Sequence, residues 1–301
     1  MSKTYNPKLQ ARLEQYIAEV GSQRKAAENI GYSEGTISTY RKGTYAGDVT
    51  KLEAKLQEMF STAEEAQDLH ISADYVPTSI STGVYDTIRL CHLKGGLAIE
   101  CGDAGIGKTK AAQKYAQDYP NTAVYVTVNP CLVSVTALLK LLCRQMHLPT
   151  GRKDDMWFEI DGHLRGGRRV IIIDEAQHLP IKTIESLRAF GDANPEVGIV
   201  LVGNAETVTA RAGRSREAFA QIKNRTKLTE IRHTSQIARE DIVLLCPAVP
   251  GKKEIDLLHT VAMSEQGIRG AMNLYSNAMD NEDVTYPGLM AMAKAMRILT
   301  Y

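Results

Sequence analysis

The sequence lacks the features that mark secreted, zinc-bound and membrane-spanning proteins. Its five cysteines are scattered and include no C-x-x-C pair, which argues against a disulfide framework or structural zinc and favours reduced thiols. No apolar run approaches the roughly 18 residues that a membrane-spanning helix needs. The first residues also contain no apolar signal core. We therefore expect a soluble, cytoplasmic protein without a membrane partner.

The sequence also has almost no net charge. The formal charge of the 301 residues is +1, so bulk electrostatics do not indicate a nucleic-acid binder. Residues 205–232 are nevertheless locally basic, which suits phosphate binding, although a solvated or intersubunit surface is an equally open interpretation. The basic residues there are Arg211, Arg214, Arg216, Lys223, Arg225, Lys227 and Arg232, against Glu206, Glu217 and Glu230.

A glycine-rich loop carries the clearest chemical signal. Residues 102–109 follow the pattern G-x-x-x-x-G-K-[ST], between an expected strand at 97–101 and an expected helix from 110. Such a loop surrounds phosphate with backbone N–H groups, and the helix N-terminus adds partial positive charge. Lys108 would reach the β- and γ-phosphates of ATP, and the Thr109 hydroxyl would hold Mg²⁺. The predicted nucleotide-binding residues are Gly102, Asp103, Ala104, Gly105, Ile106, Gly107, Lys108 and Thr109.

Polar residues follow two further apolar segments. Residues 170–173 are one valine and three isoleucines, typical of a strand buried on both faces of a parallel sheet, and Asp174 and Glu175 come next. In a P-loop ATPase the first carboxylate would hold Mg²⁺ and the second would act as general base toward the attacking water. Another expected strand, 198–203, ends at Asn204, which would orient that water. Helix capping is the alternative for Asn204.

The pattern divides the chain into four parts. Residues 1–60 are expected to be helical, 61–81 to form a polar linker that can include a short helix extension, 82–232 to form an α/β core, and 233–301 to be helical. Within the core, further strands at 123–128 and 226–231 alternate with helices. This alternation predicts a parallel α/β sheet.

The N-terminal part has the pattern of a helix-turn-helix. Helices expected at 9–20, 22–30 and 33–41 are separated by Gly21 and Gly31, and serines stand at the expected N-caps. Hydroxyls and an arginine on the third helix suit groove and phosphate contact, although a protein-binding helical bundle stays open. The candidate DNA contacts are Ser33, Thr36, Ser38, Thr39 and Arg41.

Residues 82–301 resemble the AAA+ ATPase plan. The fold class we expect is therefore α/β, with an AAA+ P-loop core, a parallel sheet, an N-terminal helix-turn-helix and a C-terminal helical lid. In that family a strand-tip asparagine is sensor 1, which matches Asn204, and an arginine opening a lid helix is sensor 2, which matches Arg269 in Gly-Ile-Arg. The arginine finger acts on the neighbouring subunit's γ-phosphate. Arg225 matches it best, with Arg214, Arg216 and Lys223 as competitors.

With its N-terminal helices the chain resembles the transposition proteins B of Mu-type phages. The resemblance rests on Gly35-Thr-Ile-Ser, on Asp174-Glu-Ala-x-His-Leu and on Val202-Gly-Asn. It implies an ATP-dependent protein that binds double-stranded DNA with little sequence preference, self-associates into a helical filament or ring, and activates a partner transposase that stimulates hydrolysis and release. Channel-facing DNA contacts are expected at 129–135 and at Arg165, Arg168 and Arg169, although a solvated turn is as good a reading of those arginines.

Two other functions stay open. A helicase loader or replication initiator shares the AAA+ core, but loaders usually begin with a helicase-binding segment in place of a helix-turn-helix. A helix-turn-helix transcription regulator with a nucleotide-sensing domain is the second alternative. The intact set of Lys108, Thr109, Asp174 and Glu175 argues against a decayed nucleotide site.

Overall fold

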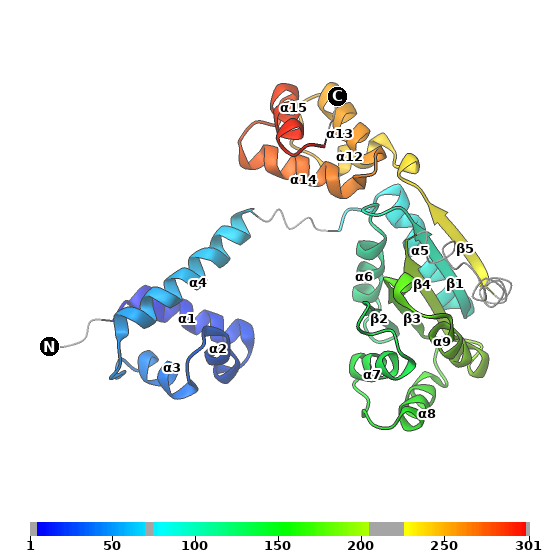
Figure 1. Cartoon of the computed structure of the whole chain (residues 1–301), viewed down its shortest axis with the longest axis horizontal. Coiled ribbons are helices and arrows are strands. Elements are labelled where there is room, and N and C mark those ends of the chain that lie inside the picture. The colour runs from blue at the N-terminus through cyan, green and yellow to red at the C-terminus, as the bar shows by residue number, and fades with distance from the viewer. Residues whose placement is uncertain (1–4, 70–74, 205–225, 299–301) are drawn as a thin grey trace. The chain divides into compact units, whose positions relative to one another are not determined.

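The computed structural model describes residues 5–69, 75–204 and 226–298, and the chain separates into two compact units, Met1–Ala73 and Asp74–Tyr301. Figure 1 shows the elements of both units. The described residues include no helix that is both long enough and apolar enough to cross a bilayer. The last helix of the first unit continues to Leu69, into the segment that the sequence predicts to be a linker with a short helix extension.

The N-terminal unit consists of four helices, α1 (Pro7–Val20), α2 (Gln23–Ile30), α3 (Glu34–Arg41) and α4 (Val49–Leu69). The first three are the helices expected from the sequence. Gly21 ends α1 in the left-handed conformation with φ 74°, and the Ser22 and Ser33 side chains cap the N-termini of α2 and α3. Leu13, Ile37 and Leu52 are fully buried in a core that joins all four helices.

The second unit contains a five-stranded parallel sheet with the strand order β2-β3-β4-β1-β5. Its strands are β1 (Gly96–Gly102), β2 (Ala123–Thr127), β3 (Val170–Asp174), β4 (Gly198–Gly203) and β5 (Thr226–Arg232). All five coincide with the expected strands. Because the strands are parallel, the residues that follow β1, β3 and β4 lie at one edge of the sheet.

Helices cover both faces of this sheet (Figure 1). They are α5 (Ser79–Lys94), α6 (Lys108–Asp118), α7 (Val135–Gln145), α8 (Lys153–Leu164) and α9 (Ile181–Ala193), with the short 3₁₀ helix η1 (Ala176–His178) before α9. Alternate strand residues face opposite sides: Ile172 packs in one cluster with α5 and α6, and Ile171 and Ile173 pack in the other with α7, α8 and α9. Burial on both faces explains why β3 is an uninterrupted apolar run.

The C-terminal part is helical, as expected. After β5 come η2 (Thr234–Gln236), α12 (Arg239–Leu245), α13 (Lys252–Met263), α14 (Gly267–Asp280) and α15 (Tyr286–Ala295). Leu258, Leu274 and Leu289 are fully buried among these helices. Asp241 at the start of α12 accepts hydrogen bonds from the backbone N–H of Ser79 at 2.7 Å and from its hydroxyl at 2.6 Å. The first helix of the second unit is therefore tied to the C-terminal helices.

Candidate functional site

The glycine loop connects β1 to α6 at the carboxyl edge of the sheet. Gly107 directly precedes α6 and has φ 97°, a left-handed conformation that favours glycine. A Cβ atom on Gly102 would lie 2.0 Å from the Arg232 carbonyl oxygen of the adjacent strand, so close approach of two backbones requires glycine there. Ile106 is fully buried and anchors the loop in the core. The local sequence thus produces a strand, a tight loop and a helix N-terminus in succession.

Lys108 points back into this loop. Its side chain is largely buried, and its ammonium group donates to the carbonyl oxygens of Gly102 at 3.1 Å and Asp103 at 2.6 Å. Burial lowers the pKa of Lys108, and the nearby negative charges of Asp174 and Glu175 act in the opposite direction. The fold therefore places Lys108 near Asp174 and Glu175, as the sequence analysis predicted.

Asp174 is 2% exposed at the end of β3. Its Oδ2 accepts a 2.8 Å hydrogen bond from the Tyr125 hydroxyl on β2, and its Oδ1 accepts the Glu175 backbone N–H at 3.0 Å. Burial raises the pKa of Tyr125 to about 12, so this phenol stays protonated and donates. Gln113 and Thr127 in turn donate to the Tyr125 oxygen at 3.4 Å and 3.0 Å. Tyr125 therefore orients the carboxylate.

Glu175 follows in an unusual backbone conformation. Its φ of 58° lies in the left-handed region, which few residues other than glycine adopt. The Gln177 side-chain amide donates to Glu175 Oε2 at 2.5 Å and accepts the Asn204 backbone N–H at 3.2 Å. Asn204 follows β4 directly. The predicted general base and the predicted sensor are therefore joined through a glutamine that the sequence analysis did not select.

The start of α14 lies against the glycine loop. The Arg269 backbone N–H donates to the Gly105 carbonyl oxygen at 3.0 Å. A Cβ atom on Gly267, whose φ is 64°, would lie 2.7 Å from the Ala104 carbonyl oxygen. Arg269 itself is exposed. The predicted sensor 2 residue therefore stands beside the loop, and it reaches the loop through backbone contact.

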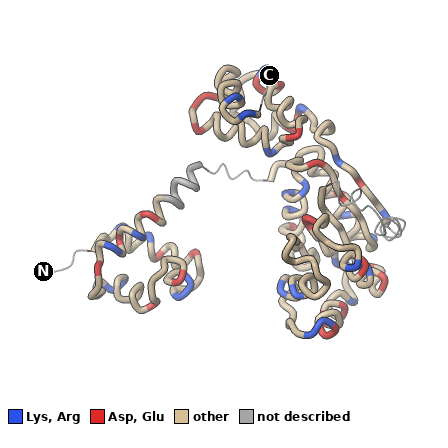
Figure 2. The backbone as a smooth tube through the Cα atoms, viewed as in Figure 1, with Lys and Arg blue, Asp and Glu red and all other residues tan. Residues whose placement is uncertain are grey.

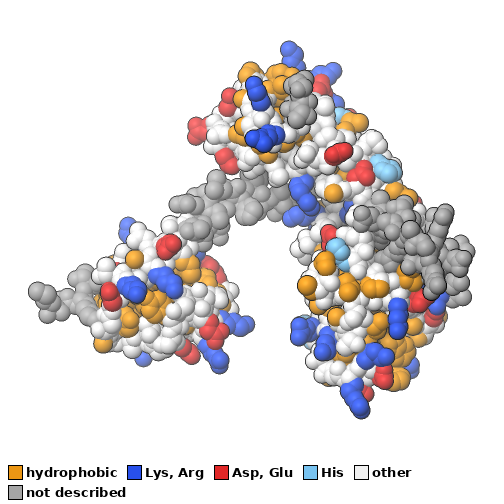
Figure 3. Space-filling view, in the orientation of Figure 1, with side chains coloured by type: hydrophobic (Ala, Val, Ile, Leu, Met, Phe, Trp, Pro, Cys, Tyr) orange, Lys and Arg blue, Asp and Glu red, His pale blue; other side chains and the backbone are white. Residues whose placement is uncertain are grey.

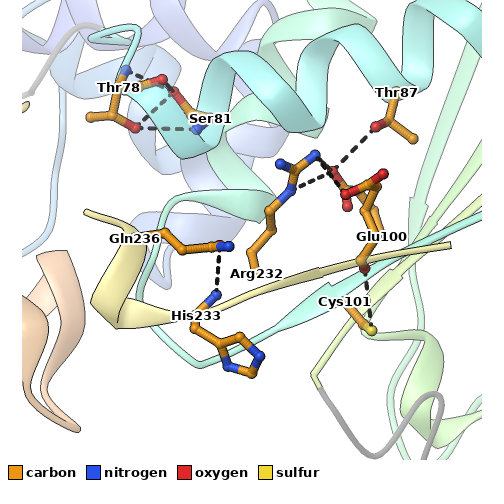
Figure 4. A network of polar contacts seen from close by, with 9 residues as sticks. Thr78, Ser81, Thr87, Glu100, Cys101, Arg232, His233 and Gln236 are labelled. Carbon is orange, nitrogen blue, oxygen red and sulfur yellow. Dashed lines mark hydrogen bonds and ion pairs between the residues drawn. The ribbon is translucent and has the colours of Figure 1, made fainter. Parts of the chain in front are cut away.

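A second connection joins the loop to the end of β5. The Asp103 backbone N–H donates to the Arg232 carbonyl oxygen at 3.0 Å, and the Asp103 carboxylate accepts the Thr234 N–H at 2.8 Å. Figure 4 shows the Arg232 guanidinium reaching the fully buried Glu100 of β1, with a shortest contact of 2.9 Å. Since β5 leads directly into the C-terminal helices, this ion pair fixes their point of attachment to the sheet.

The predicted arginine finger, Arg225, and its competitors Arg214, Arg216 and Lys223 lie outside the residues that the structure describes.

The candidate DNA contacts of the N-terminal unit are largely engaged within that unit. The Arg41 guanidinium donates to both carboxylate oxygens of Glu14, at 2.5 Å and 2.6 Å, and also to Gln23. The Ser33 hydroxyl accepts the Thr36 N–H at 3.1 Å. The Thr39 hydroxyl donates to the Gly35 carbonyl oxygen at 2.9 Å, and Ser38 is half-buried. Figure 2 shows basic and acidic positions interspersed along the backbone of this unit, and Figure 3 shows side chains of both signs on its visible face.

The second group of candidate DNA contacts lies at two opposite edges of the sheet. Arg165, Arg168 and Arg169 precede β3 and therefore stand at the amino edge, whereas residues 129–135 follow β2 at the carboxyl edge. The guanidinium groups of the three arginines contact Asp161 at 2.6 Å, the Leu93 carbonyl, and the Asn121 carbonyl at 2.8 Å, respectively. The fold does not bring these two expected channel segments together.

Comparison with known proteins identifies the core and its relatives. A family model described as an AAA domain matches residues 92–210. The ATP-dependent target DNA activator B of Escherichia phage Mu is 28% identical over 252 residues, which cover 82% of this chain and 79% of that protein. The Mu-like prophage FluMu DNA transposition protein B of Haemophilus influenzae is 25% identical over 272 residues, or 88% of this chain and 94% of that protein.

Among solved structures, the Thermotoga maritima RuvB Holliday junction branch migration motor has a TM-score of 0.45 and 14% identity, covering 72% of this chain and 68% of that one. The AAA match spans the glycine loop, Asp174, Glu175 and Asn204. The chain is therefore an ATPase with an AAA domain, similar over most of its length to the transposition proteins B of Mu and Mu-like phages.

Proposed function

We propose that this chain is an ATP-dependent DNA-binding protein that assembles on target DNA with little sequence preference and delivers it to a partner transposase. The names of its relatives, which include target DNA activation and DNA transposition, support this role. The observation that supports it most directly is the 3.0 Å hydrogen bond from the Arg269 backbone N–H in α14 to the Gly105 carbonyl oxygen. Because of this bond, a movement of the phosphate-binding loop when nucleotide binds or is hydrolysed would move the C-terminal helices.

The nucleotide would be held by the glycine loop. Backbone N–H groups of residues 102–109 and the Lys108 ammonium group would bind the phosphates. Thr109 and Asp174 offer a hydroxyl and a carboxylate, which are oxygen ligands of the type that Mg²⁺ prefers. The ion would neutralise phosphate charge, while Glu175 would accept a proton from the attacking water.

Assembly would complete the catalytic site. Asn204 and Arg269 would respond to the γ-phosphate, and an arginine such as Arg225 would reach the neighbouring subunit's nucleotide, where positive charge stabilises the transition state. A head-to-tail interface of this kind extends into a helical filament or closes into a ring. Hydrolysis would remove the γ-phosphate contacts, loosen the assembly and release DNA.

The DNA itself would be contacted by two parts of the chain. We assign a helix-turn-helix role to the N-terminal unit, with contacts from the third helix, and a phosphate-neutralising role to Arg165, Arg168 and Arg169. Positively charged groups on both parts would provide binding with little sequence preference. The protein would act in the cytoplasm of a bacterial host.

DNA binding in different nucleotide states tests the proposal. Purified protein is titrated with random-sequence duplex in ATP, in ADP and without nucleotide, at one fixed salt concentration because phosphate contacts make affinity salt-dependent. Cooperative binding that occurs only with ATP is the expected result. Equal, site-specific binding in all three states would indicate a helix-turn-helix regulator and contradict the proposal.

Two variants separate nucleotide binding from hydrolysis. Lys108→Ala removes the phosphate-binding charge, so ATP-dependent DNA binding should disappear. Glu175→Gln keeps the shape of the side chain but removes the base, so the protein should bind DNA with ATP and release it slowly. Hydrolysis at the unmodified rate in Glu175→Gln would disprove the general-base assignment.

A further inference from the structure

We propose that Gln177 is a positioning residue that joins Glu175 to the tip of β4, so that the general base and the Asn204 region move together. The proposal rests on the proposed role of Glu175. Its basis is one side-chain amide that contacts both partners, at 2.5 Å to Glu175 Oε2 and at 3.2 Å to the Asn204 backbone nitrogen.

The chemistry of the two contacts fixes the orientation of the amide. A carboxylate only accepts hydrogen bonds and a backbone N–H only donates them. The Gln177 nitrogen therefore faces Glu175 and its oxygen faces Asn204, and a flipped amide would lose both bonds. A glutamate, an alanine or a shorter asparagine at position 177 cannot reproduce this pair of contacts.

The backbone conformation of the Glu175–His178 turn places the Gln177 side chain within hydrogen-bond distance of Glu175 and Asn204. Glu175 has φ 58°, and the His178 N–H donates to the Glu175 carbonyl oxygen at 3.1 Å, closing the turn that starts η1. Ala176 is fully buried and Leu179 is 1% exposed, so both ends of this turn are anchored in the core. A strained left-handed residue held by its surroundings is a frequent feature of functional sites.

Glu175 needs such a partner. Its side chain is 46% exposed, so without a tether it would be free to adopt several rotamers, and a general base must be oriented toward the proton that it accepts. Because the second contact is to the backbone at the end of β4, a shift of that strand tip changes the direction of the Glu175 carboxylate. Gln177 would thereby link recognition at Asn204 to activation of water at Glu175.

Steady-state ATP hydrolysis by the full chain tests the link. Gln177→Ala should lower kcat by about tenfold or more, the usual range for loss of a group that orients a catalytic residue, while KM changes little because the phosphate-binding loop is intact. Gln145→Ala is the matched control, since Gln145 is exposed at the end of α7. Its kcat should equal that of the unmodified protein.

Gln177→Glu tests the same link with a side chain of nearly the same size. It replaces the donor to Glu175 with a carboxylate, which cannot donate a hydrogen bond and repels Glu175. Its kcat should therefore fall at least as far as that of Gln177→Ala, with KM again little changed. The other charged neighbours of Glu175, namely Lys108, Asp174 and His178, are unchanged in this variant.

The outcomes are distinguishable. An unchanged kcat in both Gln177 variants, with Glu175→Gln inactive, would overturn the link and leave the proposed function intact. A rise in KM as large as the fall in kcat would also overturn it, because a general loss of site structure weakens ATP binding as well. Normal hydrolysis by Glu175→Gln would show instead that the proposed role of Glu175 is wrong.

Discussion

Removing the Arg232 guanidinium group is predicted to destabilise the second unit in a pH-dependent way. Glu100 is fully buried in β1, and its Oε1 accepts from Arg232 Nη2 at 2.9 Å, from Arg232 Nε at 3.2 Å and from the Thr87 hydroxyl at 3.3 Å. Its Oε2 has no hydrogen-bond partner within the described part of the chain. Burial raises the pKa of Glu100 and Arg232 opposes that effect, so Arg232 stabilises the charged carboxylate.

The expected loss in the free energy of unfolding can be worked out from what Glu100 does when Arg232 is removed. In Arg232→Met the buried carboxyl would take up a proton, and protonating a carboxyl of pKa about 4.3 at about pH 7 costs about 3.7 kcal/mol. Breaking one side of a buried ion pair typically costs about 3–5 kcal/mol. Because the Arg232 side chain is 21% exposed, we expect a loss near the lower end, about 3 kcal/mol.

The pH dependence has a definite sign. Without Arg232, folded Glu100 keeps its proton while the unfolded chain releases it, so the unfolded state binds fewer protons and the free energy of unfolding falls as pH rises. The stability deficit, meaning the free energy of unfolding that Arg232→Met lacks relative to the unmodified protein, should therefore shrink by about 1.4 kcal/mol for each pH unit below about pH 7. It levels off once the pH falls below the pKa of Glu100 in the unmodified protein.

Urea unfolding followed by tryptophan fluorescence measures this deficit. The single tryptophan, Trp157, stacks on Phe190 in the second unit at 5.4 Å between ring centroids, so its signal reports on that unit. The double variant Glu100→Gln/Arg232→Met, which has no buried charge, should recover much of the lost stability. A deficit that is the same at about pH 7 and about pH 5, or a double variant no better than Arg232→Met, would refute the reasoning.

Three further predictions concern separate parts of the molecule. Tyr125→Phe removes the donor to Asp174, so hydrolysis should fall about 10-fold or more and require more Mg²⁺; an unchanged Mg²⁺ titration would contradict this. Glu14→Gln frees Arg41 from its ion pair, so DNA affinity should rise and the log–log salt slope should steepen by about 0.9; an unchanged slope would exclude Arg41 as a phosphate contact. Gly267→Ala places a Cβ 2.7 Å from a loop carbonyl oxygen, so ATP affinity, measured by calorimetry, should fall.

The catalytic candidates could be predicted because the relevant signals are local. The glycine loop, Asp174, Glu175 and Asn204 each come directly after an apolar strand, and a parallel sheet gathers the carboxyl ends of its strands at one edge. These residues can therefore be assigned to one edge of the sheet without knowing the order of its strands. The five strands and the C-terminal helices were predicted for the same reason, since apolar periodicity and turn residues mark them within a few positions.

The residues that orient the site could not be predicted, because their contacts depend on register between separate strands. Tyr125 reaches Asp174 only because β2 pairs with β3 so that Thr127 lies opposite Asp174. Gln177 reaches β4 only because Glu175 takes a left-handed backbone conformation. The extension of α4 past residue 60 contains alanine, glutamate and glutamine, which are good helix formers, and it lies where the sequence allows a short helix extension within the polar linker.

The glycine loop holds the C-terminal helices through backbone donors, and the Arg269 side chain takes no part in that attachment. The Asp103 carboxylate accepts the Thr234 N–H at 2.8 Å, and the Gly105 carbonyl oxygen accepts the Arg269 N–H at 3.0 Å. Both donors are backbone amides, so the attachment does not depend on the Arg269 side chain, which stays exposed beside the loop. That side chain is thereby available to respond to phosphate charge while the helices remain docked. A movement of the loop backbone at Gly105, in contrast, must move the start of α14 with it, because the Arg269–Gly105 hydrogen bond joins main-chain groups of both parts.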